Sequence, residues 1–449
     1  MLKRIHNVYF IGIGGIGMSA IARYFSMNGK KVAGYDKTPT PITDALEEIG
    51  IAIHFEDAVD NVSEAFLDQE KTLVVYTPAI PKEHKELSYF LDNGFTVLKR
   101  AEVLGKITES TFCLAVAGTH GKTTTSTILG HIMQPLEATA FLGGIAENYN
   151  SNLILGADKI SVVEADEFDR SFLHLSPNIA CITSTDADHL DIYGKHEALL
   201  DSFKEFSSKV TDALVVPKGI DINFALTYAI AEEADYVASN VRIENGTYVF
   251  DVKTPKETIK DVVFSLPGKH NMMNALGALA MANLYGVSLD DIKERLSTFK
   301  GIQRRFSYRI KSEDLVLIDD YAHHPTEVQA VAASVEELYP EKKKLVVFQP
   351  HLFSRTQDFA DGFATALASF DELILLEIYP ARELPIEGVT SSWLLEKVDL
   401  ENKKLVADKN LAEEILKSDA SVITILGAGD IGLLVNDVKN KLKKEKNIV

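Results

Sequence analysis

The residues best suited to chemistry form a glycine-rich run, Ala117-Gly118-Thr119-His120-Gly121-Lys122-Thr123-Thr124. The apolar run FCLAV precedes it and TSTILGHIM, with helical spacing, follows it, so the pattern predicts a turn from a strand into a helix. Such a turn aims backbone N–H groups at an anion, and the helix dipole favours negative charge there. We expect Lys122 to bridge terminal phosphates and the Thr123 hydroxyl to hold Mg²⁺. Val116 stands where the full phosphate-loop pattern has glycine, but the G-x-x-G-K-T core is complete.

A second glycine-rich turn, Gly12-Ile-Gly14-Gly15-Ile-Gly17, follows the apolar run VYFIG, and Asp36 ends the next apolar run. This spacing is typical of a dinucleotide-binding turn with its acidic partner about 20 residues further on. The motif specifies only a diphosphate on a helix N-terminus, so UDP, NAD and FAD all fit it. Residues 427–432, GAGDIG, match the same pattern but lie too near the C-terminus for a further strand and acid. We interpret them as a turn or a site edge.

Two acidic clusters follow apolar runs that are typical of strands. They are Glu164-Ala-Asp166-Glu167 after ISVV, and Asp186-Ala-Asp188-His189-Leu-Asp191 after IACIT. Ligands bind an open α/β sheet at the carboxyl ends of its strands, where the phosphate loop also lies. A carboxylate there can hold Mg²⁺, and a histidine can join it for a second divalent ion. The alternative is that these acids cap the next helix, and it is weaker for Glu164, because a carboxylate entering a buried strand needs a partner.

The last third of the chain carries two more polar segments after apolar runs. They are residues 319–325, DDYAHHP, after LVLI, and residues 351–355, HLFSR, after KLVVFQP. Neighbouring side chains on an extended segment point to opposite sides, so we expect one member of each Asp or His pair to face a site. Arg355 could clamp a carboxylate or a phosphate, because its planar fork matches both. Arg304 and Arg305 could do the same, or could be ordinary surface arginines.

Apolar runs bounded by Gly or Pro alternate with segments of helical period, which predicts α/β domains with mainly parallel sheets. We expect a Rossmann-like domain over residues 1–106, a central P-loop ATPase domain over 107–302 and a C-terminal Rossmann-like α/β domain over 303–449. The central block includes a β-rich stretch over 236–266 and a helix capped by Asn271 and stopped by Gly286. Residues 299–310 have the pattern of a connector, and the Lys-rich tail that of a solvated helix end.

Length and charge narrow the class of protein. The 449 residues suggest about three domains, and 46 Lys+Arg against 65 Asp+Glu give a formal charge of −19. An acidic surface opposes nucleic-acid binding. Cys113 and Cys181 are too few for a disulfide framework, and the sequence has no uncharged apolar run of about 18 residues. We expect a cytoplasmic protein with no nucleic-acid partner and no membrane insertion.

The motifs taken in order resemble those of the Mur ligases of peptidoglycan synthesis, over nearly the whole chain. They read G-x-G-G-x-G-M-S, G-T-H-G-K-T-T, E-A-D-E, D-H-x-D, G-x-H-N-x-x-N, R-R-F, D-D-Y-x-H-H-P and L-G-A-G-D-I. The resemblance implies an ATP-dependent ligase that joins L-alanine to the lactyl carboxylate of UDP-N-acetylmuramate through an acyl phosphate, with Mg²⁺. Its substrates would be UDP-N-acetylmuramate, ATP and L-alanine. The main alternative is the family's ligase that reattaches murein tripeptide.

The resemblance also implies roles for individual residues. Those expected to meet the UDP-sugar are Gly14, Gly15, Gly17, Met18, Ser19 and Asp36. Those expected to bind ATP are Gly118, Thr119, His120, Gly121, Lys122, Thr123, Thr124, His270, Asn271, Asn274, Arg305 and Asp320. The metal ligands would be Thr123, Glu164 and His189. The catalytic set would be Lys122, His189, His324 and Arg355, the last two beside the amino acid.

Three questions stay open at this point. This chain reads Pro350-His351-Leu352 where related ligases usually read P-H-R, so one arginine contact on the amino-acid side is missing or replaced. Free alanine is mostly ammonium at pH 7, so a base is needed, and His189, His323 and His324 are the candidates. An NAD-dependent oxidoreductase would use the 12–17 turn but would leave the Lys122 loop unexplained. An ATP-driven binding or regulatory protein without ligation is a third possibility.

Overall fold

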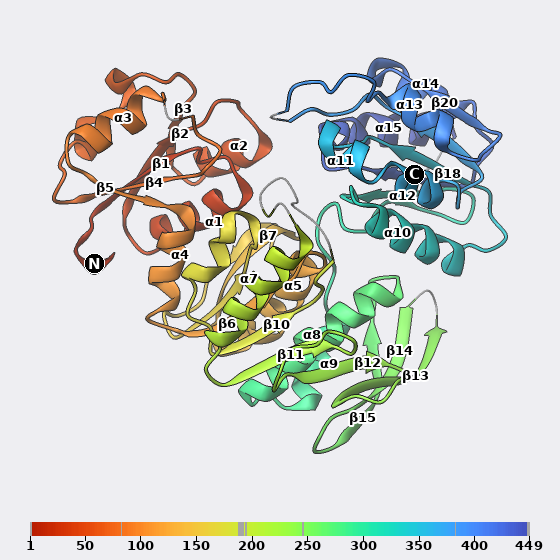
Figure 1. Cartoon of the computed structure of the whole chain (residues 1–449), viewed down its shortest axis with the longest axis horizontal. Coiled ribbons are helices and arrows are strands. Elements are labelled where there is room, and N and C mark those ends of the chain that lie inside the picture. The colour runs from red at the N-terminus through yellow and green to blue at the C-terminus, as the bar shows by residue number, and fades with distance from the viewer. Residues whose placement is uncertain are drawn as a thin grey trace. The chain divides into compact units, whose positions relative to one another are not determined.

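The structure is a computed structural model that describes residues 2–81, 83–186, 193, 195–244, 247–381 and 383–446. It contains three sheets, of five, ten and six strands, so the prediction of a three-domain, mainly parallel α/β chain is confirmed. Figure 1 shows them in red to orange, yellow to green, and teal to blue. One compact unit comprises Met1–Arg242, Val249–Phe264 and Met273–Lys300, and the other comprises Ile243–Tyr248, Ser265–Met272 and Gly301–Val449.

The first sheet is wholly parallel, with strand order β3-β2-β1-β4-β5. Along β1, Val8 and Phe10 pack on one face with α1, while Tyr9 and Ile11 pack on the other with Phe66. This alternation follows from the two-residue period of a strand. The strands are β1 Asn7–Ile11, β2 Lys31–Tyr35, β3 Ala52–His54, β4 Thr72–Tyr76 and β5 Thr96–Lys99, and the helices are α1 Ile16–Met27, α2 Pro41–Glu47, α3 Lys85–Asp92 and α4 Arg100–Thr108.

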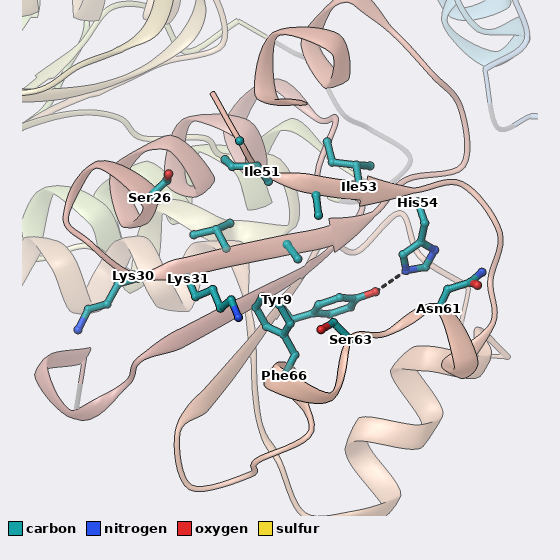
Figure 2. Close-up of a pocket in the computed structure, with 14 residues that line it drawn as sticks. Tyr9, Ser26, Lys30, Lys31, Ile51, Ile53, His54, Asn61, Ser63 and Phe66 are labelled. Atoms are coloured by element: carbon teal, nitrogen blue, oxygen red, sulfur yellow. Dashed lines mark hydrogen bonds between the residues drawn. The ribbon is translucent and has the colours of Figure 1, made fainter. Parts of the chain in front are cut away.

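A buried polar cluster lies on the second face of this sheet. The Tyr9 hydroxyl donates to Glu86 Oε2 at 2.7 Å and lies 2.7 Å from His54 Nε2, and the Ala58 N–H donates to Glu86 Oε1 at 3.2 Å. Figure 2 shows Tyr9 and His54 in the wall of a pocket of about 470 Å³. Burial raises the pKa of Glu86 to about 7, although the bonds from Tyr9 and Ala58 lower it.

The second sheet has the order β15-β14-β13-β12-β11-β10-β6-β9-β7-β8. The run from β13 to β7 is parallel, and β8 is antiparallel to β7. The strands are β6 Phe112–Ala117, β7 Thr139–Ala146, β8 Ser151–Ile154, β9 Ile160–Glu164, β10 Ile179–Ile182, β11 Ala213–Pro217, β12 Leu226–Ile230, β13 Tyr236–Glu244, β14 Thr247–Lys253 and β15 Thr258–Phe264. The helices are α5 Lys122–Met133, α7 His196–Ser208, α8 Lys269–Tyr285 and α9 Leu289–Ser297.

Three predictions for this block meet different outcomes. The β-rich stretch is confirmed as β13, β14 and β15, and α8 stops before Gly286 as expected. The prediction that Asn271 caps α8 is wrong, because the helix begins at Lys269. The carbonyl of Gly268 accepts from the N–H groups of Asn271 and Met272, and the Asn271 side chain donates back to the Pro267 carbonyl at 2.6 Å.

The third sheet has the order β16-β17-β21-β18-β19-β20, parallel except for β16. The expected connector is partly a strand, because residues from Ser307 onward form β16. Up to Glu445, the Lys-rich tail is the end of a helix that buries Val435, Val438 and Leu442, as predicted, and residues 447–449 lie outside the described residues. The strands are β16 Ser307–Lys311, β17 Val316–Asp320, β18 Lys344–Phe348, β19 Glu372–Leu375, β20 Lys403–Leu405 and β21 Val422–Leu426, and the helices are α10 Pro325–Leu338, α11 Phe353–Asp358, α12 Ala360–Leu367, α13 Ser391–Lys397, α14 Leu411–Leu416 and α15 Ile431–Glu445. Among the described residues, no helix has the length and apolar character needed to cross a membrane.

The buried carboxyl of Glu86 should make stability depend on pH. The pKa of Glu86 in the folded chain, about 7, lies above its usual 4.5. The contribution of this carboxyl to the free energy of unfolding is therefore present below pH 4.5 and is lost as the pH rises through 7. Glu86→Gln removes this titration and keeps the shape. The melting temperature of the variant minus that of the wild type should increase between pH 5 and pH 8, by about 2–4 °C for each kcal/mol. A difference that stays constant or decreases over this range would contradict the assignment.

Candidate functional site

The glycine-rich run at the end of β6 forms the predicted turn into α5. Gly118 and Gly121 take φ values of +127° and +80°, which glycine adopts at little cost. A Cβ atom on Gly118 would lie 2.2 Å from Thr183 Oγ1, and one on Gly121 would lie 2.5 Å from Asn274 Oδ1. The loop is therefore closely packed on both sides, and an added methyl group would displace it.

The segment after β10 holds the outer part of this loop. The Thr119 N–H donates to the Ser184 carbonyl at 3.1 Å, and the His120 N–H donates to Ser184 Oγ at 2.8 Å. The Thr183 hydroxyl donates to the Ala117 carbonyl at 3.0 Å. Strand β10 is the neighbour of β6, so its carboxyl end lies directly beside the turn.

Lys122, the first residue of α5, points back over the loop. Its ammonium donates to the Gly118 carbonyl at 2.6 Å and to Glu167 Oε1 at 3.0 Å, and Glu167 Oε2 lies 2.8 Å away. Glu167 is fully buried. Burial of the ammonium lowers the pKa of Lys122, but Glu167, Asp166 and Glu164 together outweigh this and raise the pKa above its usual value. The loop therefore contains a fixed positive charge.

Thr123 and Glu164 place two hard oxygen atoms, of the kind that Mg²⁺ binds, next to that lysine. The Thr123 hydroxyl donates to Glu164 Oε1 at 3.1 Å, and the Gly143 N–H donates to Glu164 Oε2 at 3.0 Å. Adjacent ligands on octahedral Mg²⁺, each at 2.0–2.1 Å, lie about 3 Å apart, so the spacing fits this ion. No cluster of three or more His, Cys, Asp or Glu suited to a metal occurs among the described residues. Mg²⁺ commonly keeps waters and substrate phosphates as its other ligands. The predicted ligand His189 lies outside the described residues.

The turn after β1 has the form expected of a phosphate-binding turn. Gly12 takes a φ of +87°, and the Gly14 N–H donates to Asp36 Oδ2 at 2.7 Å. A Cβ atom on Gly17 would lie 2.4 Å from Arg100 Nη1, so a guanidinium lies against the N-terminus of α1. Arg100 Nη2 donates to Asp166 Oδ2 at 3.2 Å. Asp36 thus holds the turn itself, and Arg100 adds a cation that connects it with the acidic cluster after β9.

Met18 and Ser19 face inward from this turn. Both are buried, and Ser19 Oγ accepts from Asn152 Nδ2 at 2.8 Å. The same amide donates to the Ile16 carbonyl at 2.6 Å. The contact joins the first helix to β8 of the second sheet. The expected meeting of Met18 and Ser19 with the UDP-sugar stays a prediction.

In the second unit, polar segments follow β17, β21 and β18, which are neighbouring parallel strands. Asp320 ends β17, and its carboxylate accepts from the Phe306 N–H at 2.6 Å and from the Ala322 N–H at 2.7 Å. Burial raises the pKa of Asp320 to about 6, although Arg305 and these two donors lower it. Residues 427–432 form the turn from β21 into α15, as predicted, and the Ile431 N–H donates to Gln349 Oε1 at 3.0 Å.

The histidines of this edge differ in their surroundings. His324 is buried and caps α10, with Nδ1 accepting from the Thr326 N–H at 3.3 Å. His323 Nδ1 lies 3.0 Å from the Tyr321 carbonyl and 3.2 Å from Glu327 Oε2. Both neighbours of that nitrogen are acceptors, so Nδ1 carries the proton and Nε2 has the lone pair. Burial lowers the pKa of His323 in spite of the Glu327 carboxylate.

The residues after β18 form a compact group that is partly buried. Leu352 is buried and takes a φ of +71°, a left-handed value that costs a leucine energy. His351 stacks on Tyr379 with ring centroids 5.7 Å apart. Arg355 is also buried, and its Nη1 lies 3.4 Å from His351 Nδ1. Leu352 thus packs inward at the place where an arginine was expected.

Comparison with known families accounts for most of the chain. The model of the Mur ligase family catalytic domain matches residues 7–111, the Mur ligase middle domain matches 116–282, and the Mur ligase glutamate ligase domain matches 304–431.

The chain belongs to the Mur ligase family.

Among relatives, a UDP-N-acetylmuramate–L-alanine ligase of Flavobacterium psychrophilum is 60% identical over 448 residues, 99% of this chain and 100% of that protein. The Parabacteroides distasonis protein of the same name is 48% identical and covers 99% of each chain. The solved UDP-N-acetylmuramate–alanine ligase of Thermotoga maritima gives a TM-score of 0.84 at 26% identity and covers 98% of this chain and 99% of that one. A murein peptide ligase of Psychrobacter arcticus gives 0.69 at 23% identity over 99% of each chain, a likeness of fold.

For this Mur ligase, sequence reasoning did not identify several residues that shape the site. Arg100, Ser184 and Asn152 were not named, and Glu167 was quoted only as part of its cluster. Arg100 directly follows β5, so the rule that carboxyl ends of parallel strands share an edge could have identified it. Asn152 carries no such signal, because its role depends on contact between two sheets.

The packing of Gly143 against Glu164 gives a test of the metal site. A Cβ atom on Gly143 would lie 2.2 Å from Glu164 Oε2 and 2.7 Å from Oε1, so Gly143→Ala must move the carboxylate. We expect the Mg²⁺ concentration for half-maximal ATP turnover to rise by about tenfold or more, because ligand orientation governs metal affinity. Mg²⁺ titration of ADP formation measures it. An unchanged Mg²⁺ requirement in a variant with native melting temperature would argue against Glu164 as a ligand.

Proposed function

We propose that this chain joins L-alanine to the lactyl carboxylate of UDP-N-acetylmuramate at the cost of ATP. The observation that carries the proposal is the 60% identity over 99% of the chain to a protein named for this ligation. The Lys122 loop, with its buried partner Glu167, supplies the phosphate site that such a reaction needs. Mur ligases use ATP, and a nicotinamide oxidoreductase would have no use for this loop.

The physical difficulty of the reaction is the approach of a carboxylate to a triphosphate. Two unit charges 4 Å apart repel by about 4 kcal/mol at an effective dielectric constant near 20. The Lys122 ammonium and the N-terminus of α5 stand at the loop before the substrates arrive, so positive charge is already in place to stabilise the added negative charge. We assign Thr123 and Glu164 to hold Mg²⁺, which would neutralise phosphate charge when bound.

The UDP-sugar is assigned to the turn after β1. The N-terminus of α1 attracts a diphosphate, and Gly14, Gly15 and Gly17 allow its close approach. The Arg100 guanidinium beside Gly17 adds positive charge at that place. Because Arg100 also pairs with Asp166, it connects the sugar-nucleotide turn with the ATP loop.

The proposed ligation takes place in two steps. A lactyl carboxylate oxygen attacks the γ-phosphorus of ATP, ADP leaves, and an acyl phosphate remains. The alanine amine attacks the acyl carbon, the C–O bond to phosphate breaks, and an amide and inorganic phosphate form. The alanine ammonium must lose one proton before it attacks, and we assign His323 Nε2 as the acceptor among the described histidines, because its Nδ1 is held by two acceptors. The second proton leaves with the inorganic phosphate. Water must be excluded, since an acyl phosphate hydrolyses.

The closest competing function is the reattachment of murein tripeptide. The fold likeness to a murein peptide ligase and the buried Leu352 on the amino-acid side are the reasons to test it. One assay offers ATP and UDP-N-acetylmuramate with L-alanine, with other amino acids, or with the tripeptide, and scores ADP. We expect L-alanine to give the highest kcat/KM by at least about tenfold, an energy difference of about 1.4 kcal/mol. Preference for the tripeptide would replace the proposed function, and no ADP with any acceptor would favour a regulatory protein.

Lys122→Met should separate the two ligand sites. It removes the cation but keeps an apolar stem, so we expect ATP-dependent phosphate release to fall by about 10³-fold or more, because phosphoryl transfer depends on such charges. UDP-N-acetylmuramate affinity, measured by calorimetry, should stay within about twofold, because its assigned turn lies on another sheet. Loss of both together in a folded variant would contradict separate sites.

A further inference from the structure

Glu167 is a buried carboxylate that takes no part in the steps of the proposed reaction. Its side chain is 0% exposed, and both of its oxygens lie within 3.0 Å of the Lys122 ammonium. The backbone around it is also fixed. Its carbonyl accepts from the Tyr193 hydroxyl at 2.6 Å and from the Arg170 N–H at 2.9 Å. The carboxylate is therefore held in place by its own segment as well as by the lysine.

Lys122 is bound to the protein in this state. Its ammonium donates to the Gly118 carbonyl at 2.6 Å, to the Thr119 carbonyl at 3.3 Å and to Glu167 at 3.0 Å. An ammonium has three protons, so these three acceptors use its full donor capacity. A phosphate can accept a bond from Lys122 only if at least one of these contacts is given up.

We propose that Glu167 is a positioning residue that holds the Lys122 ammonium against the loop carbonyls until a nucleotide takes it over. The inference rests on the proposed role of this loop in binding ATP. A nucleotide must break the Lys122–Glu167 ion pair in order to bind, so Glu167 lowers the affinity of the loop for phosphates.

The ion pair therefore selects among ligands of this loop. A small anion such as inorganic phosphate makes few other contacts that could offset the loss of the Lys122–Glu167 ion pair. A nucleotide triphosphate has further contacts along the loop amides and can compensate. The loop therefore binds ATP in preference to free phosphate.

The experiment measures ATP affinity without the other substrates, by calorimetry in Mg²⁺, for the wild type and for Glu167→Gln. The amide keeps the shape and can still accept a bond, but it loses the charge that holds Lys122. We expect the Kd for ATP to fall by roughly three- to tenfold, which lies in the lower part of the range found for residues in contact. KM for ATP should fall in parallel while kcat does not rise, and the Kd for inorganic phosphate should fall as well. A residue with a purely structural role would instead raise KM.

Two comparisons make the test specific. Glu86→Gln, at another fully buried glutamate of the same unit, should leave the Kd for ATP unchanged. In a Lys122→Met background, Glu167→Gln should tighten ATP binding by less than twofold, because there is no ammonium to release. Glu167→Asp keeps the charge and withdraws it by one methylene, so it should give an intermediate Kd if Glu167→Gln does not fold.

The outcomes separate the two proposals. If the wild type does not bind ATP, the proposed function itself fails. If the wild type binds ATP and Glu167→Gln or Glu167→Asp binds it no more tightly, only the role of Glu167 is wrong. Equal tightening in the Lys122→Met background would also overturn that role, because the effect would then be general repulsion by a negative charge.

Discussion

One cation among three carboxylates is the constraint on which the central part of this structure depends. Lys122 is charged because Glu164, Asp166 and Glu167 lie around it, and the fully buried Glu167 carboxylate is tolerated because both of its oxygens lie beside the Lys122 ammonium. Removing either side would leave uncompensated charge in a low-dielectric site. Parallel pairing of β6 with β9 sets Val116 opposite Glu164, so the loop after one strand and the acids after the other are neighbours by register.

The same geometry recurs in the other two sheets. In each, glycine turns and polar residues follow the carboxyl ends of parallel strands, where helix N-termini point at the same edge. The protein carries a formal charge of −19, yet Lys122 and Arg100 stand at such edges in the first unit. In the second unit, Arg305 lies in the connector and Arg355 follows β18. Local cations rather than the net charge therefore decide which anions the molecule can bind.

Sequence patterns were sufficient for whatever depends on local chemistry. The Lys122 loop and its neighbours were predicted correctly from the glycine-rich run, the order of strand, turn and helix, and the acidic run after β9. They were insufficient where a contact joins distant segments. Asn152 reaches Ser19 across two sheets, and Asp320 binds the backbone of Phe306, which no spacing encodes. The wrong prediction that Asn271 caps α8 has a local cause. Asparagine is a common N-cap, and Gly268 gives no apolar pattern that would indicate an earlier start of the helix.

The proposed ligation requires that a lactyl carboxylate oxygen is transferred to the γ-phosphorus of ATP. The most direct test uses UDP-N-acetylmuramate with both lactyl carboxylate oxygens labelled with ¹⁸O, together with ATP and L-alanine, followed by mass spectrometry of the products. The account predicts one ¹⁸O in the inorganic phosphate and one in the amide carbonyl, with none in ADP. Phosphate without label, formed together with ADP, would show that water and not the carboxylate attacks ATP, and would contradict the proposed ligation.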